Sequence, residues 1–301
     1  MNPPQWPPQI TDLTVPSTFD GEAQPLLYYE GSGEGPRPLL VALHSWSADY
    51  KQPLSIPSAD RCVENGWAFV HPSFRGPNRR PEACASDAAV RDVLDAVDYA
   101  IANTDVDTER VYLVGGSGGG HMALAMAGRH PERWSAVSAW CPITDVAAWH
   151  YECRDNYPQY ADMVAACCGG VPRPGSLEEG DARRRSPLYF VDRAKGLPID
   201  LNAGIRDGHD GPVPVHHTLW AFNALAEPDD RIGEDAIRHI VERVEVPEPL
   251  RFEGADDTYG DMPVLMRRES GSTRVTVFDG GHDIVRDAAH RWLAQHRRKT
   301  S

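Results

Sequence analysis

The sequence predicts an α/β protein: a mostly parallel central sheet with helices on both faces and a small inserted cap. Three observations lead to this fold class. Short apolar runs alternate with helical patterns along most of the 301 residues, as they do in βαβ units. A glycine-rich turn, GGSGGG at 115–120, joins an expected strand to an expected helix. The alternation stops between about 145 and 186, so we expect one domain, residues 1–301, with a cap at 145–186.

The expected strands are short apolar runs bounded by turn residues. In chain order they are 10–16, 25–29, 38–44, 66–71, 111–114, 134–140, a stretch that ends at Ile205, and a hairpin that turns at Gly271. Asp20-Gly21, between the first two strands, is typical of a hairpin turn. We therefore expect antiparallel pairs near both ends of the chain and parallel strands between them.

The expected helices carry apolar side chains at a spacing of about 3.6 residues. The clearest helix lies within 81–104. Its apolar stripe consists of Val90, Val93, Leu94, Val97 and Ile101. A small-residue helix begins near Gly118 and is stopped by Gly128 and Pro131. Two more are expected at 215–226 and within 228–249. The last helix is predicted from the stripe Ile284, Val285, Ala288, Ala289, Trp292 and Leu293.

The glycine-rich turn matches the pattern G-x-S-x-G, with Ser117 at its centre. This pattern is typical of a nucleophile elbow, a strained turn from a strand into a helix that exposes a serine hydroxyl. A nucleotide-binding loop is disfavoured, because no Lys-Ser/Thr pair follows the glycines and only a loose G-x-G-x-x-A fits, too far inside the helix. We expect Ser117 to be a nucleophile, and a structural turn with an incidental serine is the alternative.

A serine nucleophile needs a base that is oriented by a carboxylate, and in this architecture the chain order is serine, acid, histidine. His282 follows the last expected strand in DGGHD and is the expected base. Asp207 comes soon after the apolar stretch that ends at Ile205 and is the expected acid. Asp210 and Asp145 are the alternatives for this role.

Two backbone N–H groups are expected to form an oxyanion hole. One belongs to Gly118, directly after the nucleophile, and the other to Trp46, after the strand 38–44. Ser45 is the alternative to Trp46.

Four further residues are candidates for substrate binding: Arg75, Trp140, His121 and His209. Arg75 lies in the basic stretch SFRGPNRR, which can hold a substrate carboxylate. A solvated loop with surface ion pairs is the alternative for this stretch. The aromatic residues of the insertion at 145–186 can roof the pocket, or they can form the surface of a homodimer.

Several stretches of the chain match one known family. They are LLVALHSW, FVHPSFRG, RVYLVGGSGGGHMAL, RSPLYFVDRAKGLPIDLNAGIRDG, VPVHHTLWAFNAL and DGGHD. In these stretches, which span most of 38–290, the chain resembles the catalytic domain of prolyl-oligopeptidase-like serine hydrolases, within the α/β-hydrolase superfamily. The resemblance implies the α/β-hydrolase fold and a Ser117–Asp207–His282 triad. One departure is His44-Ser45, where the oxyanion loop of the family usually has His-Gly.

The start of the chain bears on the substrate. Peptidases of this group carry a large N-terminal propeller, whereas this chain begins almost directly with its first strands. The resemblance therefore implies a hydrolase of carboxylic esters, such as acetyl or methyl esters of carbohydrates or of other small molecules. A prolyl-oligopeptidase-like serine peptidase or aminopeptidase, and a non-catalytic binding protein of the same fold, are the alternatives.

The composition indicates which classes of partner and which cellular compartment to expect. The net charge of −14 argues against nucleic acid and anionic membranes as partners. The N-terminus lacks the regions of a signal peptide and no stretch has the length of a membrane span, so we expect a cytoplasmic protein. Its cysteines are expected to be free thiols, with a bridge from Cys153 to Cys167 or Cys168 as the alternative. We expect no cofactor and no metal, because His150 and these cysteines lack compact zinc spacing.

Overall fold

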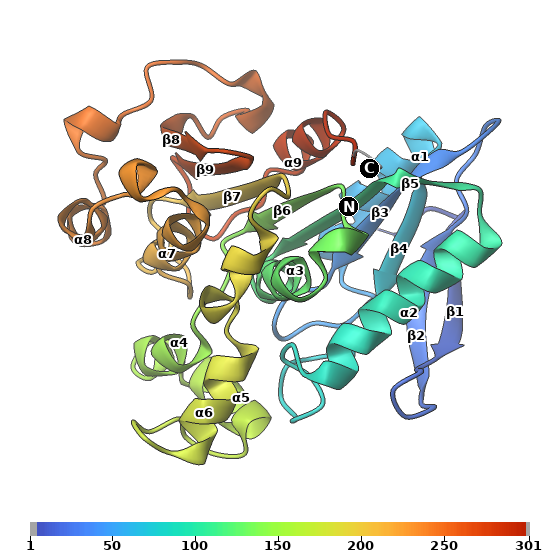
Figure 1. Cartoon of the computed structure of the whole chain (residues 1–301), viewed down its shortest axis with the longest axis horizontal. Coiled ribbons are helices and arrows are strands. Elements are labelled where there is room, and N and C mark those ends of the chain that lie inside the picture. Colours follow the sequence, from blue (N-terminus) through green and yellow to red (C-terminus); the bar gives the residue numbers. More distant parts are fainter. Residues whose placement is uncertain (1–4, 299–301) are drawn as a thin grey trace.

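In residues 5–298, which the computed structural model describes, nine strands form one sheet in the order β1-β2-β4-β3-β5-β6-β7-β9-β8 (Figure 1). The strands are β1 (Thr11–Pro16), β2 (Ala23–Tyr29), β3 (Arg37–Leu43), β4 (Ala68–Pro72), β5 (Val106–Gly116), β6 (Ala136–Trp140), β7 (Ile199–Gly204), β8 (Val264–Ser270) and β9 (Thr273–Phe278). The six strands from β4 to β9 in the sheet order run parallel to one another. The outer pairs β1–β2, β2–β4 and β9–β8 are antiparallel.

The central strands bury both of their faces, which explains why their sequences are continuous apolar runs. Along β3, Leu39, Val41 and Leu43 belong to one buried cluster. Leu40 and Ala42 belong to a second cluster on the opposite face. The period of two along the strand therefore divides the interior into two layers.

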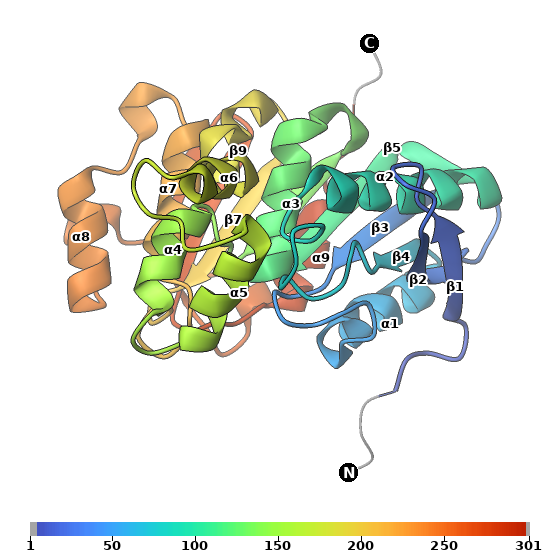
Figure 2. The same ribbon diagram turned by 90° about the horizontal axis from the view of Figure 1, so that it is seen from below.

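The helices are α1 (Ile56–Asn65), α2 (Asp87–Asn103), α3 (Gly118–Arg129), α4 (Val146–Cys153), α5 (Pro158–Cys168), α6 (Leu177–Arg185), α7 (His216–Leu225), α8 (Glu234–Arg243) and α9 (Arg286–Leu293). Helices α2, α3, α7 and α8 contribute to the first buried cluster, and α1 and α9 to the second (Figures 1 and 2). The mostly parallel sheet with helices on both faces is the fold class that the sequence predicts.

Two helical segments differ from the sequence prediction. Helix α1 was not expected; it has Pro57 in its first turn and ends at Gly66, whose φ of 68° is the left-handed conformation that suits a helix end. At the other end of the chain, Ile284 and Val285 were expected inside the last helix. Helix α9 begins only at Arg286, so Ile284 and Val285 belong to the loop before it.

The segment between β6 and β7 forms the three short helices α4, α5 and α6, which project below the sheet in Figure 1 and toward the viewer in Figure 2. A third buried cluster joins these helices to the rest of the molecule, with Trp149 of α4 packed edge-on against Trp46 of the loop after β3, their ring centroids 4.7 Å apart. The pattern of this segment looks irregular in the sequence because each helix is short.

All six cysteines are free and buried, so the bridge considered for Cys153 is not present. Burial raises the pKa of Cys153 to about 12 and that of Cys168 to about 12, which keeps both as neutral thiols. Among the described helices, none combines the length and the apolar character needed to cross a membrane.

Candidate active site

Ser117 lies at the turn between β5 and α3, at the carboxyl end of a central strand. Its backbone has φ 57° and ψ −122°, a conformation that costs a residue with a side chain about 1–3 kcal/mol. The surrounding structure holds it there: the Ser117 N–H donates to the carbonyl of Trp140 at 2.8 Å, and the Ser117 carbonyl accepts from the His121 N–H at 2.9 Å. This is the strained strand-to-helix turn that the sequence predicts.

The glycines around Ser117 are required because backbone packs directly on backbone. A Cβ atom at Gly115 would collide with the carbonyl group of Gly119, and one at Gly118 with the backbone nitrogen of Trp46. A Cβ atom at Gly120 would lie 2.8 Å from the carbonyl oxygen of Trp140. The absence of side chains thus allows α3 to approach its neighbouring strands and the loop after β3.

Asp207 and His282 are hydrogen-bonded to each other. His282 follows β9, Asp207 follows the adjacent strand β7, and His282 Nδ1 lies 2.7 Å from Asp207 Oδ2. The other carboxylate oxygen of the buried Asp207 accepts the N–H groups of Gly208 at 3.1 Å and Val213 at 3.2 Å. With a carboxylate as its acceptor, Nδ1 of neutral His282 carries the proton and Nε2 presents its lone pair.

The two alternative acids have other partners. Asp210 is exposed and forms an ion pair with Arg206 at 3.3 Å. Asp145 caps α4 by accepting the Ala148 N–H, and its other oxygen accepts the hydroxyl of Tyr189 at 2.6 Å. Of the three candidates, only Asp207 is hydrogen-bonded to His282.

The expected oxyanion donors are close together. A Cβ at Gly118 would collide with the backbone nitrogen of Trp46, so these two backbones are in contact. The N–H of Ser45, the alternative donor, is already bonded to Gln52 Oε1 at 3.0 Å. Neither the Trp46 nor the Gly118 N–H donates to another group in residues 5–298. This difference favours Trp46 over Ser45.

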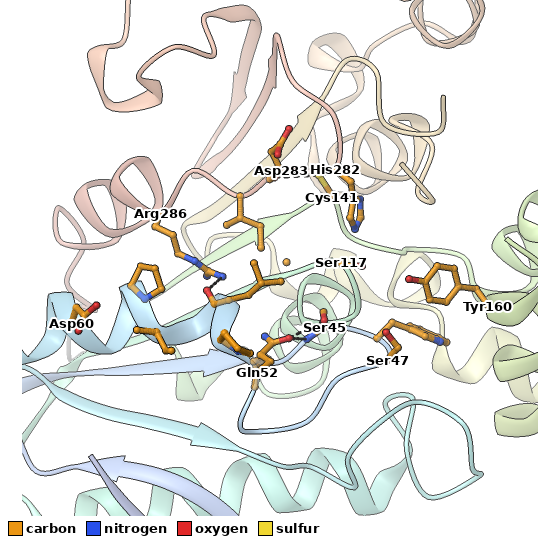
Figure 3. A pocket seen from close by; sticks show the side chains of 18 residues that line it. Ser45, Ser47, Gln52, Asp60, Ser117, Cys141, Tyr160, His282, Asp283 and Arg286 are labelled. Carbon is orange, nitrogen blue, oxygen red and sulfur yellow. Dashed lines mark hydrogen bonds between the residues drawn. The ribbon is translucent and has the colours of Figure 1, made fainter. Parts of the chain in front are cut away.

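Ser117 and His282 line the same cavity, which has a volume of about 990 Å³ (Figure 3). Its apolar lining comes mainly from the segment before and within α1, from α5 and from the loop before α9. These residues are Leu43, Trp46, Pro53, Leu54, Ile56, Pro57, Tyr160 and Ile284. The cavity is large enough for a substrate of several residues or rings.

Arg75 is not among the residues that line this cavity, and its predicted role in substrate binding is wrong for a physical reason. Its guanidinium is buried and bonded to Asp92 at 2.6 Å, to Asp20 at 2.7 Å and to the Ser17 hydroxyl at 3.0 Å. These partners neutralise the cation and occupy its donors. Arg75 therefore joins the β1–β2 hairpin to α2 instead of facing a substrate.

The remaining substrate-binding candidates also lie outside the cavity lining. Trp140 is fully buried, and its indole N–H donates to Ser138 Oγ at 2.9 Å. His121 is buried beneath Trp46, and its Nδ1 lies 3.0 Å from the Ile143 carbonyl. His209 is exposed, and its Nε2 lies 2.8 Å from the Val241 carbonyl. Trp140 and His121 support the elbow and the loop after β3 from behind.

Several residues that line the cavity were not singled out in the sequence, among them Gln52, Cys141 and Arg286. Gln52 orients Ser45 and, through its amide N–H, also donates to Ser55 Oγ at 3.0 Å. Cys141 has a φ of 44° and lies beside Ser117 and His282 on the cavity wall; burial raises its pKa, so it is a neutral thiol. Arg286 comes four residues after His282, and its proximity to that residue in the chain is the one signal that could have singled it out.

Within residues 5–298, two groups of side chains have the composition of metal ligands. One consists of Cys141, Asp207 and His282, and the other of Glu152, His216 and His217. In the second group, Nδ1 of His217 accepts the Thr144 N–H at 3.2 Å, which leaves the proton on Nε2, pointing at Glu152. Burial opposes ionisation of Glu152, but hydrogen bonds from both histidines outweigh it and hold the pKa of Glu152 well below its usual range. This group is therefore satisfied internally.

A serine on a strand-to-helix elbow, beside a histidine–aspartate pair at the carboxyl ends of parallel strands, defines a serine hydrolase of the α/β-hydrolase fold. The chain belongs to the prolyl oligopeptidase family, whose model matches residues 63–234.

Relatives within this family give the comparison more detail. The chain is 24% identical over 270 residues to acylamino-acid-releasing enzyme 2 of Oryza sativa subsp. japonica, covering 80% of this chain and 33% of that protein. It is 37% identical over 141 residues to the acylamino-acid-releasing enzyme of Rattus norvegicus, covering 45% of this chain and 18% of that protein. The chain thus spans a third or less of these relatives.

Solved structures share the fold. An acylaminoacyl peptidase of Pyrococcus horikoshii superposes with a TM-score of 0.60 at 15% identity, over 94% of this chain and 40% of that one. A puromycin hydrolase gives 0.60 at 16% identity, over 95% and 37%. The fluorophosphonate-binding serine hydrolase FphF of Staphylococcus aureus gives 0.58 at 14% identity, over 95% of this chain and 96% of that one.

Proposed function

We propose that this chain is a serine peptidase that cleaves short N-acylated peptides, with Ser117 as nucleophile, His282 as general base and Asp207 as the carboxylate that orients it. The observation that carries the proposal is the 2.7 Å hydrogen bond between His282 and the buried Asp207, at the wall of the cavity that Ser117 also lines. It fixes the imidazole with Nε2 available to accept a proton.

The reaction follows from this geometry. His282 Nε2 accepts the Ser117 proton while Oγ attacks the carbonyl carbon of the substrate. The negative charge on the substrate oxygen is stabilised by the N–H groups of Gly118 and Trp46, and one such donor is typically worth about 2.7–4 kcal/mol. The protonated His282 then donates to the leaving amine, and water hydrolyses the acyl-enzyme by the same route.

The choice of a peptide over an ester rests on the relatives, whose names describe release of acylamino acids. They favour the peptidase alternative over the carbohydrate esterase that we expected from the sequence. Arg75, a candidate for holding a substrate carboxylate, is buried in ion pairs and gives no support to an acidic carbohydrate as the substrate. Esters react through the same groups, so ester hydrolysis alone does not separate the two functions.

Helices α4–α6 are proposed to act as a cap over one side of the cavity. Tyr160 of α5 contributes to the cavity lining, and Trp149 of α4 packs on Trp46 beside the expected oxyanion hole. Because this cap contacts both the cavity lining and the loop that carries the Trp46 N–H, a substrate that displaces the cap would also shift this oxyanion donor.

The test compares the hydrolysis of acyl amide substrates with that of acetyl esters. We expect Ser117-dependent hydrolysis of N-acetyl-phenylalanine p-nitroanilide and of N-acetylated dipeptides, with Ser117→Ala abolishing it. A fluorophosphonate probe should label the wild type and not this variant. Efficient hydrolysis of p-nitrophenyl acetate or acetylated sugars with no amide hydrolysis would instead establish an esterase, and absence of labelling would establish a non-catalytic protein.

A further inference from the structure

One end of the active-site cavity carries a cation. Arg286, at the first position of α9, is the only arginine or lysine among the described residues that line the cavity. In Figure 3, Ser117 lies between Arg286 on one side and Tyr160 on the other. The cavity therefore has an aromatic end near α5 and a cationic end near α1 and α9.

Arg286 has a single hydrogen bond in residues 5–298: its Nη2 donates to the Leu54 carbonyl at 2.5 Å. The other four N–H groups of the guanidinium have no protein acceptor there. Burial lowers the pKa of Arg286 to about 10, so the side chain stays charged at neutral pH. A partly buried guanidinium with most of its donors free can bind an anion.

The carboxylates around Arg286 do not neutralise it. Asp287, next in the chain, forms ion pairs with Arg61 at 3.1 Å and Arg291 at 2.7 Å. Asp283 also lines the cavity; its carboxylate accepts the Gly281 N–H at 2.8 Å and forms no ion pair with Arg286. Asp60 lines the cavity but is exposed to water, which screens its charge, and it forms no ion pair with Arg286.

The helix that carries Arg286 does not offset the positive charge of the side chain either. A cation in the first turn of a helix faces the positive end of the helix dipole, which is unfavourable. The same helix end favours a bound anion, so the two features act in the same direction on a negatively charged ligand.

The segment that carries Arg286 also carries His282, the general base of the proposed reaction. His282, which protonates the leaving group, precedes Arg286 by four residues, and Ile284 between them packs against Gly116 next to the nucleophile. Both Ile284 and Arg286 line the cavity. With the leaving portion of the substrate on the side of this segment, a group bonded to Arg286 belongs to the part that His282 releases.

We propose that Arg286 binds the free carboxylate of the leaving portion, so that the preferred substrates are short acyl peptides that end in a carboxylate close to the cleaved bond. This inference rests on the proposed function and specifies its substrate. It predicts discrimination between an acid and its amide, two ligands of nearly the same shape that differ in charge.

The first experiment measures kcat/KM of the wild type for N-acetyl-Phe-Ala and for N-acetyl-Phe-alaninamide. A charge-assisted hydrogen bond should favour the acid by roughly 10- to 100-fold, mainly through KM. In Arg286→Gln the ratio should fall toward one, and Arg286→Lys should keep part of it. Equal kcat/KM for the acid and the amide in the wild type, or a ratio that persists in Arg286→Gln, would overturn the proposal.

Arg291→Gln is the matched control, because it removes an arginine from the same helix outside the cavity. It should leave the ratio unchanged, and a matching loss of the ratio in this variant would count against Arg286. Thermal melts of all variants show whether they fold. If Arg286→Gln does not fold, the wild-type ratio and Arg286→Lys still decide.

A binding measurement separates this inference from the proposed function. In Ser117→Ala, calorimetric Kd values for the same acid and amide report recognition without turnover. If the peptide acid binds more tightly than the peptide amide but the wild type cleaves no peptide bond, the role of Arg286 is supported and the peptidase function is refuted. Turnover of both peptides without any preference for the acid would support the peptidase and refute the role of Arg286.

Discussion

Replacing Asp207 by asparagine tests the arrangement of the proposed triad most directly. In the structure, Oδ1 of Asp207 accepts the N–H groups of Gly208 and Val213, and Oδ2 faces His282 Nδ1 at 2.7 Å. The amide oxygen of an asparagine must take the place of Oδ1 to satisfy the two N–H groups. Its NH₂ group then points at His282 and requires Nδ1 to be unprotonated.

This change reverses the tautomer of His282. With its proton on Nε2, the imidazole cannot accept the Ser117 proton, and in such triads the loss is about 10⁴-fold in kcat. At about 1.36 kcal/mol for each factor of ten, that corresponds to about 5.4 kcal/mol of transition-state stabilisation. Because the asparagine preserves shape and the two backbone hydrogen bonds, the fold should remain.

The assay is kcat/KM for an N-acetylated p-nitroanilide, with circular dichroism melts as the test of folding. Asp210→Asn is the control, since Asp210 is exposed and paired only with Arg206 on the surface. We expect this variant to keep wild-type activity. A folded Asp207→Asn enzyme within about tenfold of the wild type, or an equal loss in Asp210→Asn, would refute the reasoning.

Two further predictions concern packing and pH. Gly118→Ala places a methyl group against the Trp46 backbone and should lower the free energy of unfolding by about 1–3 kcal/mol and reduce kcat. Gly180→Ala, at an open position of a helix, should raise the free energy of unfolding by about 0.4–1 kcal/mol. Urea melts that show a change of the same sign for both variants would contradict this prediction. Burial lowers the pKa of His121 to about 4 and that of His290 to about 3, below the 6.5 of an unfolded histidine. The unfolded chain therefore binds more protons than the folded chain below pH 6.5. The free energy of unfolding should fall as the pH drops from 6.5 to 4, by up to about 1.4 kcal/mol per pH unit for each histidine. His290→Gln should show a shallower decline in urea melts over this range, and an unchanged slope would count against the assignment.

Features set by local sequence were predictable. The elbow at Ser117 is one, because glycines on both sides of a serine between a strand and a helix leave few other conformations. Most strands and helices were also predictable, since the periodicity of their apolar residues is visible in short windows of sequence. The positions of Asp207 and His282 at strand ends could be expected, but the spacing of Asp207 and Asp210 alone could not decide which carboxylate turns toward the histidine.

Features set by contacts between distant segments were not predictable. Arg75 reads as a free cation in the sequence, yet it pairs with Asp20 in a hairpin and with Asp92 in a helix. Helix α1 escaped notice because its sequence, IPSADRCVEN, has few apolar residues and has a proline at its second position. Arg286 gains its interest only when the fold brings its helix to the same cavity as α1 and α5.

The packing of bare main chain beneath Ser117 has a consequence for how selectivity can change. No side chain can be added at Gly115, Gly118 or Gly120 without moving the reactive centre, so the base of the cavity is not free to vary. The surrounding walls come from stretches that are far apart in the chain, near Leu54, Tyr160 and Arg286. The first and the last are joined by the hydrogen bond from Arg286 to the Leu54 carbonyl, so they would have to be exchanged together. Exchanging the stretch around Tyr160 by itself is therefore the more practical route to redirecting the enzyme toward other substrates.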